Sequence, residues 1–136
     1  MALVNLVDES SSHPTVKRVF RDIKVTKKID FVPHFWRALA ATPELLDQVW
    51  SQLKRTMQPG KVDMLTKEII ALAVSATNGC KYCISSHTAA VQKLGLDRDG
   101  YAEVLAVIGL FNLTNSLADA LQVEPDIKPD PTWPVG

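Results

Sequence analysis

The feature that most constrains the fold of this chain is a helical repeat of apolar residues, interrupted at intervals by proline and glycine. In the clearest case, Val16, Val19, Phe20 and Ile23 fall on one face of a helix. No segment shows the period-2 alternation of apolar and polar residues that is typical of a strand. The breakers that divide the chain into helical segments are Pro14, Pro33, Pro43, Pro59-Gly60, Asn78-Gly79 and Gly95. The pattern predicts an all-α protein.

We expect these segments to form a bundle of five to six helices. The segments 63–76 and 80–94 are expected to form an antiparallel helical hairpin that turns at Asn78-Gly79, and the last helix runs from about residue 99 to 123. A chain of 136 residues is long enough for one core, so we predict a single domain over residues 1–124. Residues 125–136 form a Pro-rich tail, whose Trp133 would dock on the domain or reach a neighbouring subunit.

Charge and apolar runs exclude several classes of partner. Fifteen basic residues balance fifteen acidic ones, which argues against a nucleic acid or a membrane surface held by bulk charge. The N-terminus lacks a basic segment followed by a long apolar one, and no apolar run is expected to span a membrane, so we expect a cytoplasmic protein. In a reducing compartment, two cysteines three residues apart indicate chemistry or a metal rather than a structural staple.

The two cysteines and a histidine share one face of a predicted helix, because Cys80, Cys83 and His87 are spaced by three and four residues. Residues one turn apart lie within the Cα separation of roughly 4.4–6.8 Å that a disulfide tolerates. With the turn at Asn78-Gly79, Cys80 opens the helix, where free amides and the helix dipole stabilise a thiolate. His87 is placed to take the proton of Cys83 as a general base. The spacing predicts a thiol redox site.

Glu68 joins this site through the register of the predicted hairpin. In an antiparallel pair that turns at residues 78 and 79, position 68 lies opposite position 89 and level with His87. Glu68 shares an otherwise apolar helix face with Leu72 and Ser75, where an acid requires a partner. A glutamate that orients His87 would complete a Glu–His–Cys relay. By the same count, Ser75 lies level with Tyr82, and its hydroxyl is predicted to bond a thiol or a bound peroxide.

The run from Lys67 to His87 resembles the signature of the alkylhydroperoxidase AhpD-like group, within the carboxymuconolactone decarboxylase superfamily. The likeness rests on a Glu, a Cys twelve residues later, a second Cys after three more and a His after four more. Flanking segments resemble the subgroup of peroxidase-related enzymes, and together they cover most of the chain. These segments include Val32-Pro33-His34-Phe35, Pro43-Glu44-Leu45-Leu46 and Phe111-Asn112-Leu113-Thr114-Asn115. The resemblance implies an AhpD-like helical bundle with peroxidase activity.

The resemblance also implies roles and partners. Cys83 would be the thiol that attacks the peroxide, Cys80 the resolving thiol, and Glu68 with His87 the proton relay. The implied substrate is a small hydroperoxide and the implied reductant a lipoyl-bearing or thioredoxin-like dithiol, with no cofactor and no metal. The resemblance further implies that this chain is a homo-oligomer, such as a trimer, a hexamer or another assembly. Tyr82 stands where the best-known AhpD proteins have a further histidine, so the relay is shorter by one titrating group.

Two other interpretations of the same residues remain. A dithiol sensor or adaptor would form the same reversible disulfide and pass oxidising equivalents to a partner protein without turning over peroxide. A zinc site is the second, because Cys80, Cys83, His87 and Glu68 are four acceptable zinc ligands. The true decarboxylases of the superfamily lack the cysteine pair, which argues against that activity here.

Overall fold

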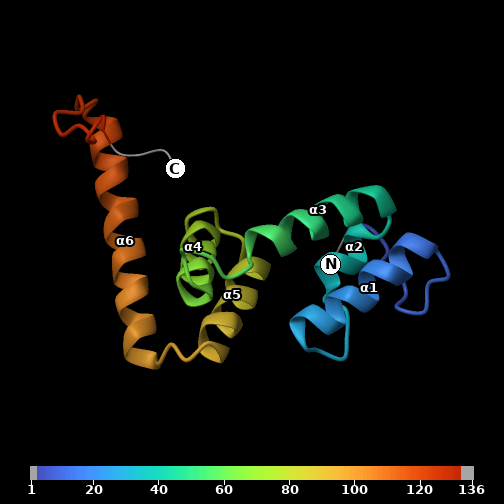
Figure 1. Cartoon of the computed structure of the whole chain (residues 1–136). Helices are drawn as coiled ribbons and strands as arrows, with labels where there is room; N and C mark the ends of the chain where they lie inside the picture. The colour runs from blue at the N-terminus through green and yellow to red at the C-terminus, as the bar shows by residue number, and fades with distance from the viewer. Residues whose placement is uncertain (1–2, 133–136) are drawn as a thin grey trace. The chain divides into compact units, whose positions relative to one another are not determined.

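A computed structural model describes residues 3–132, and within this range the chain forms six helices and no strand, as predicted (Figure 1). The helices are α1 (Pro14–Lys27), α2 (His34–Leu39), α3 (Pro43–Thr56), α4 (Met64–Thr77), α5 (Lys81–Lys93) and α6 (Arg98–Ala120). The chain divides into two compact units, Met1–Pro59 and Gly60–Gly136. The single domain over residues 1–124 therefore stays a prediction, and Trp133 lies outside the described residues.

The first unit has a closed apolar core that is built from α1, α2 and α3. The face of α1 predicted from the sequence is buried, and two tryptophans from the other helices complete the core, with their rings edge to face at 5.1 Å. The buried side chains are Val16, Val19, Phe20, Ile23, Val32, Trp36, Ala40, Leu46 and Trp50. This unit thus covers most of its large apolar side chains by itself.

A polar network at the edge of this core joins α1 to α3. The indole Nε1 of Trp50 donates to Oδ2 of Asp22 at 2.7 Å, and the same oxygen accepts from Nζ of Lys54. These two hydrogen bonds, first from Lys54 and then from Trp50, hold the pKa of Asp22 below its ordinary value.

The lowered pKa predicts a pH dependence of stability. A carboxylate with a lowered folded pKa stabilises the fold above its unfolded pKa of about 3.9, and this contribution disappears as the pH falls through the folded pKa. Asp22→Asn should therefore lower the free energy of unfolding at pH 7 by about 1 kcal/mol. Urea denaturation at pH 7 and pH 3 checks this expectation, since the gap between wild type and variant should shrink at pH 3. A gap of equal size at both pH values would contradict it.

The second unit is built on the hairpin of α4 and α5, with α6 packed on α4. Two side-chain hydrogen bonds tie α6 to the hairpin: Nδ2 of Asn112 donates to Oγ1 of Thr77 at 3.1 Å, and the hydroxyls of Tyr101 and Thr88 lie 3.1 Å apart. The hairpin of α4 and α5 that the sequence predicts is present, since these two helices pack along each other.

One expectation about apolar runs needs correction. No membrane-spanning run was expected, yet α6 is long and apolar enough to cross a bilayer by length and composition, with a mean hydropathy of 1.3. None of its residues is buried in the structure. Length and hydropathy alone do not separate a membrane span from a helix that packs against protein.

Candidate active site

The hairpin that carries the cysteines is shaped by three local features of the chain. Asp63 caps α4 by accepting from the amide of Thr66 at 2.9 Å, a hydrogen bond that also lowers the pKa of Asp63. At the other end of α4, Gly79 adopts a φ of +69°, a left-handed conformation that favours glycine. The amide of Cys80 then donates to the carbonyl of Ser75 at 3.0 Å. The chain therefore reverses at the predicted Asn78-Gly79 turn and places Cys80 directly before α5.

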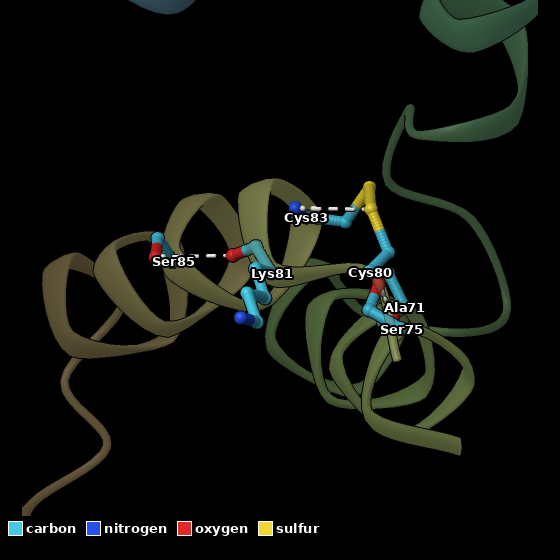
Figure 2. The surroundings of a disulfide bond; sticks show 6 residues. All are labelled: Ala71, Ser75, Cys80, Lys81, Cys83 and Ser85. Carbon is cyan, nitrogen blue, oxygen red and sulfur yellow. Dashed lines mark hydrogen bonds between the residues drawn. A yellow bond between two sulfur atoms is a disulfide. The ribbon is translucent and has the colours of Figure 1, made fainter. Parts of the chain in front are cut away.

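Cys80 and Cys83 are joined by a disulfide, with their Cα atoms 5.3 Å apart (Figure 2). This separation lies inside the range expected for two residues one helical turn apart. The predicted pairing of the two thiols is therefore seen. Both cysteines are half-buried, so the bond is neither fully exposed nor sealed inside the unit.

Cys80 is the residue that caps α5 rather than the first residue of the helix. Its Sγ accepts from the amide of Cys83 at 3.3 Å, as the dashed line in Figure 2 shows. A sulfur at this position faces the free amides and the positive end of the helix dipole, both of which stabilise a thiolate. The helix N-terminus thus acts directly on Cys80, whereas Cys83 lies one turn inside, four residues before His87.

Glu68 and His87 meet between α4 and α5, as the hairpin register predicts. Oε2 of Glu68 lies 2.6 Å from Nδ1 of His87, and both side chains are largely shielded, with 14% and 27% of their surfaces exposed. An ionised carboxylate only accepts, so a neutral imidazole that faces it carries its hydrogen on Nδ1 and its lone pair on Nε2. Contact with Glu68 therefore favours the tautomer of His87 in which Nε2 can act as a base.

Packing holds this pair in place. Leu72 lies four residues after Glu68, and Val91 lies four residues after His87. Both Leu72 and Val91 are wholly buried. Residues four apart share a helix face, so the Glu–His contact and the two buried side chains belong to the same faces of α4 and α5. The site is thus part of the hairpin's own packing.

The two auxiliary residues, Ser75 and Tyr82, are placed differently from each other. Ser75 is buried beside Cys80, but its hydroxyl donates to the carbonyl of Ala71 at 2.6 Å instead of to a sulfur. Its oxygen can still accept a hydrogen bond, and its carbonyl holds the amide of Cys80. Tyr82 lies between the cysteines and is exposed. The catalytic roles of all six predicted residues stay predictions.

The geometry also bears on the zinc interpretation. Within residues 3–132, no three side chains of His, Cys, Asp or Glu are grouped so that they could hold a metal ion. Glu68 and His87 are engaged with each other, and the two sulfurs form a bond. The four residues of the zinc interpretation therefore do not meet as ligands of one metal ion in this disulfide-bonded form.

A shallow hollow of about 350 Å³ lies between α4 and α6, and none of the predicted site residues lines it. Its lining is apolar except for Glu103, and includes Ile69 and Ala73 of α4. The sulfur site and this hollow therefore use different faces of α4.

The carboxymuconolactone decarboxylase family matches residues 43–123. The alkyl hydroperoxide reductase AhpD of Streptomyces avermitilis is 37% identical over 62 residues, which make up 46% of this chain and 34% of that protein. An (R)-2-haloacid dehalogenase of Pseudomonas putida is 30% identical over 111 residues, or 78% of this chain and 35% of that protein. The chain spans about a third of the length of these curated relatives.

A solved structure agrees over nearly the whole chain. The alkylhydroperoxidase AhpD core from Rhodospirillum rubrum is 49% identical and superposes with a TM-score of 0.88. The match covers 93% of this chain and 95% of that one. The predicted all-α, AhpD-like fold is therefore confirmed.

Proposed function

The chain belongs to the carboxymuconolactone decarboxylase family, and from this premise we propose that it is a thiol-dependent peroxidase that reduces hydroperoxides. The names of several relatives indicate alkyl hydroperoxide reductase activity. The observation that carries the proposal for this chain is the combination of a Cys80–Cys83 disulfide with a Glu68–His87 contact on the same hairpin. Peroxide reduction by a dithiol requires a nucleophilic thiol, a second thiol and a base. All three lie on this hairpin.

The oxidative half of the proposed reaction consumes one hydroperoxide. His87 takes the proton of Cys83 at Nε2. The Cys83 thiolate then attacks the terminal oxygen of the hydroperoxide, the one that carries the hydrogen. The O–O bond breaks, a sulfenic acid forms on Cys83, and the alkoxide leaves with the proton that His87 returns. The thiol of Cys80 then condenses with the sulfenic acid, which forms the disulfide and releases water.

The reductive half requires an external dithiol. A thiolate of the donor attacks the disulfide and forms a mixed disulfide, and the second donor thiol releases the reduced chain and leaves the donor oxidised. We propose a lipoyl-bearing or thioredoxin-like donor and a cytoplasmic setting, where such donors are kept reduced. No cofactor takes part in these steps.

Steady-state turnover tests the proposal. The full chain is incubated with hydrogen peroxide or an organic hydroperoxide and with dihydrolipoamide or reduced thioredoxin, and peroxide loss is followed. We expect many turnovers per chain with at least one donor and none without a donor. A disulfide that forms reversibly without turnover would favour the dithiol sensor or adaptor over the peroxidase.

Two further measurements separate the remaining candidates. Metal analysis of freshly purified protein is expected to find less than stoichiometric zinc, and one zinc per chain held by Cys80 and Cys83 would overturn the redox proposal. Because the Pseudomonas relative is named a dehalogenase, (R)-2-haloacids belong in the substrate panel. Release of halide without any dithiol donor, in the absence of peroxide turnover, would contradict the peroxidase.

A further inference from the structure

The backbone of the turn between α4 and α5 is bonded to the end of α4. The amides of residues 78–80 donate to carbonyls of the last turn of that helix at 3.0 to 3.2 Å. The acceptors are the carbonyls of Val74, Ala76 and Ser75. The last turn of a helix frays unless other groups hold it in place. The position of Cys80 therefore depends on how firmly the end of α4 is held.

A side chain of α6 holds this end of α4. Nδ2 of Asn112 donates to Oγ1 of Thr77 at 3.1 Å, and Thr77 is the last residue of α4, three before Cys80. The second side-chain hydrogen bond described above between α6 and the hairpin joins Tyr101 to Thr88, in the second half of α5. Of these two hydrogen bonds, the one from Asn112 is the one that lies at the turn.

Asn112 is itself held in one orientation. Its Nδ2 also donates to the carbonyl of Ile108, one turn earlier in α6, at 2.8 Å. Because that carbonyl only accepts, the nitrogen of the amide faces it, and the two hydrogens of this nitrogen serve the two bonds. Asn112 is half-buried between two exposed neighbours, Phe111 and Leu113, so it lies on the side of α6 that packs on α4. Its side chain thus bonds Thr77 from a fixed position.

The two redox states place different demands on the turn. In the disulfide form, the bond between the sulfurs keeps the Cα atoms of Cys80 and Cys83 5.3 Å apart. In the dithiol form that bond is absent, and the turn depends on its hydrogen bonds to α4. A contact that orders the turn in the dithiol form raises the effective concentration of one thiol at the other, because less backbone freedom is lost when the disulfide closes. Loss of such a contact should make the disulfide easier to reduce.

We propose that Asn112 is a positioning residue of the thiol site, which acts through Thr77 to keep Cys80 within reach of Cys83 in the dithiol form. We call the hydrogen bond from Asn112 to Thr77 the α6 clamp. This role rests on the proposed function, because the clamp matters only if the chain cycles between dithiol and disulfide. It adds a residue of α6 to a site whose other members lie on α4, on α5 and in the turn between them.

Redox titration of the full chain against mixtures of reduced and oxidised glutathione tests the α6 clamp. Thr77→Val removes the acceptor at nearly the same side-chain volume. We expect its equilibrium constant for disulfide formation to fall about threefold to tenfold, the effect of one hydrogen bond of ordinary strength. Thr77→Ser keeps the hydroxyl and should titrate like wild type. Tyr101→Phe is the matched control, because it removes the other hydrogen bond between α6 and the hairpin, away from the turn. An unchanged constant in Thr77→Val, or an equal fall in Tyr101→Phe, would overturn the proposal.

A double-mutant cycle covers the case in which Thr77→Val changes the turn for another reason. Asn112→Leu should cause the same fall as Thr77→Val, and the two substitutions together should cause no further fall, since each removes the same bond. A double variant whose loss equals the product of the two single losses would show that Asn112 does not act through Thr77.

The titration uses no peroxide, so its outcome is separate from that of the peroxidase assay. A lowered constant in Thr77→Val, with no peroxide turnover in wild type, would support the α6 clamp and contradict the peroxidase. Peroxide turnover in wild type, with an unchanged constant in the variant, would do the reverse. After one equivalent of peroxide, the sulfenic acid of Cys83 should persist several-fold longer in Thr77→Val, because Cys80 condenses with it more slowly. Equal lifetimes in wild type and variant would count against the clamp.

Discussion

Replacing Cys83 with serine is expected to lower steady-state peroxide consumption by at least about a hundredfold, since a serine hydroxyl does not form the nucleophile at neutral pH. Cys80→Ser should behave differently, because Cys83 can still attack one peroxide before it stalls as a sulfenic acid. The reduced variants are mixed with peroxide and a diketone probe that traps sulfenic acid, and the labelled residue is identified by mass spectrometry. Labelling of Cys83 in Cys80→Ser is the expected result.

This experiment also decides between the two sulfurs, which the structure places in different surroundings. Cys80 has the hydrogen bond from the first turn of α5, and Cys83 has His87 four residues away. Rapid labelling of Cys80 in the Cys83→Ser variant, with no labelling of Cys83 in the other, would reverse the proposed roles. Ser85→Ala serves as the control, because Ser85 is exposed on the same helix and only bonds the carbonyl of Lys81.

Glu68→Gln is expected to slow the oxidation of the reduced protein by about 10²-fold, the lower end of what general acid–base catalysis contributes. A glutamine amide can donate to Nδ1 of His87, which would move the imidazole hydrogen to Nε2 and remove the lone pair that accepts the thiol proton. The measurement is the single-turnover rate of disulfide formation after peroxide is added. Alkylation by iodoacetamide at pH 7 should slow as well, because less thiolate is present.

A double-mutant cycle distinguishes a relay from a purely structural contact. If Glu68 acts through His87, then Glu68→Gln should cause almost no further loss in a His87→Asn background. Glu103→Gln is the matched control on an exposed glutamate of the same unit and should leave the rate unchanged. If the rate loss of the double variant instead equals the product of the losses of the two single variants, the relay is contradicted.

Several features were predicted correctly from the residues alone. The buried face of α1, the turn at residues 78 and 79 and the closeness of Cys80 to Cys83 all appear in the structure. Each depends on a few neighbouring residues, because the 3.6-residue period and a left-handed glycine are local properties of the backbone. Counting residues along the hairpin did not predict the partner of the Ser75 hydroxyl. This hydroxyl donates to the carbonyl of Ala71 in its own helix rather than to a sulfur.

The sequence by itself determined the all-α class with five to six helices, the helical stripe of Cys80, Cys83 and His87, and the family resemblance, which is confirmed. Only the tertiary structure decided that Glu68 contacts Nδ1 of His87, that the chain divides after Pro59, and that α6 buries none of its residues. The physical reason is the range of the interactions. Spacing along one helix follows from backbone geometry, whereas contacts and exposed faces depend on how helices distant in the sequence pack.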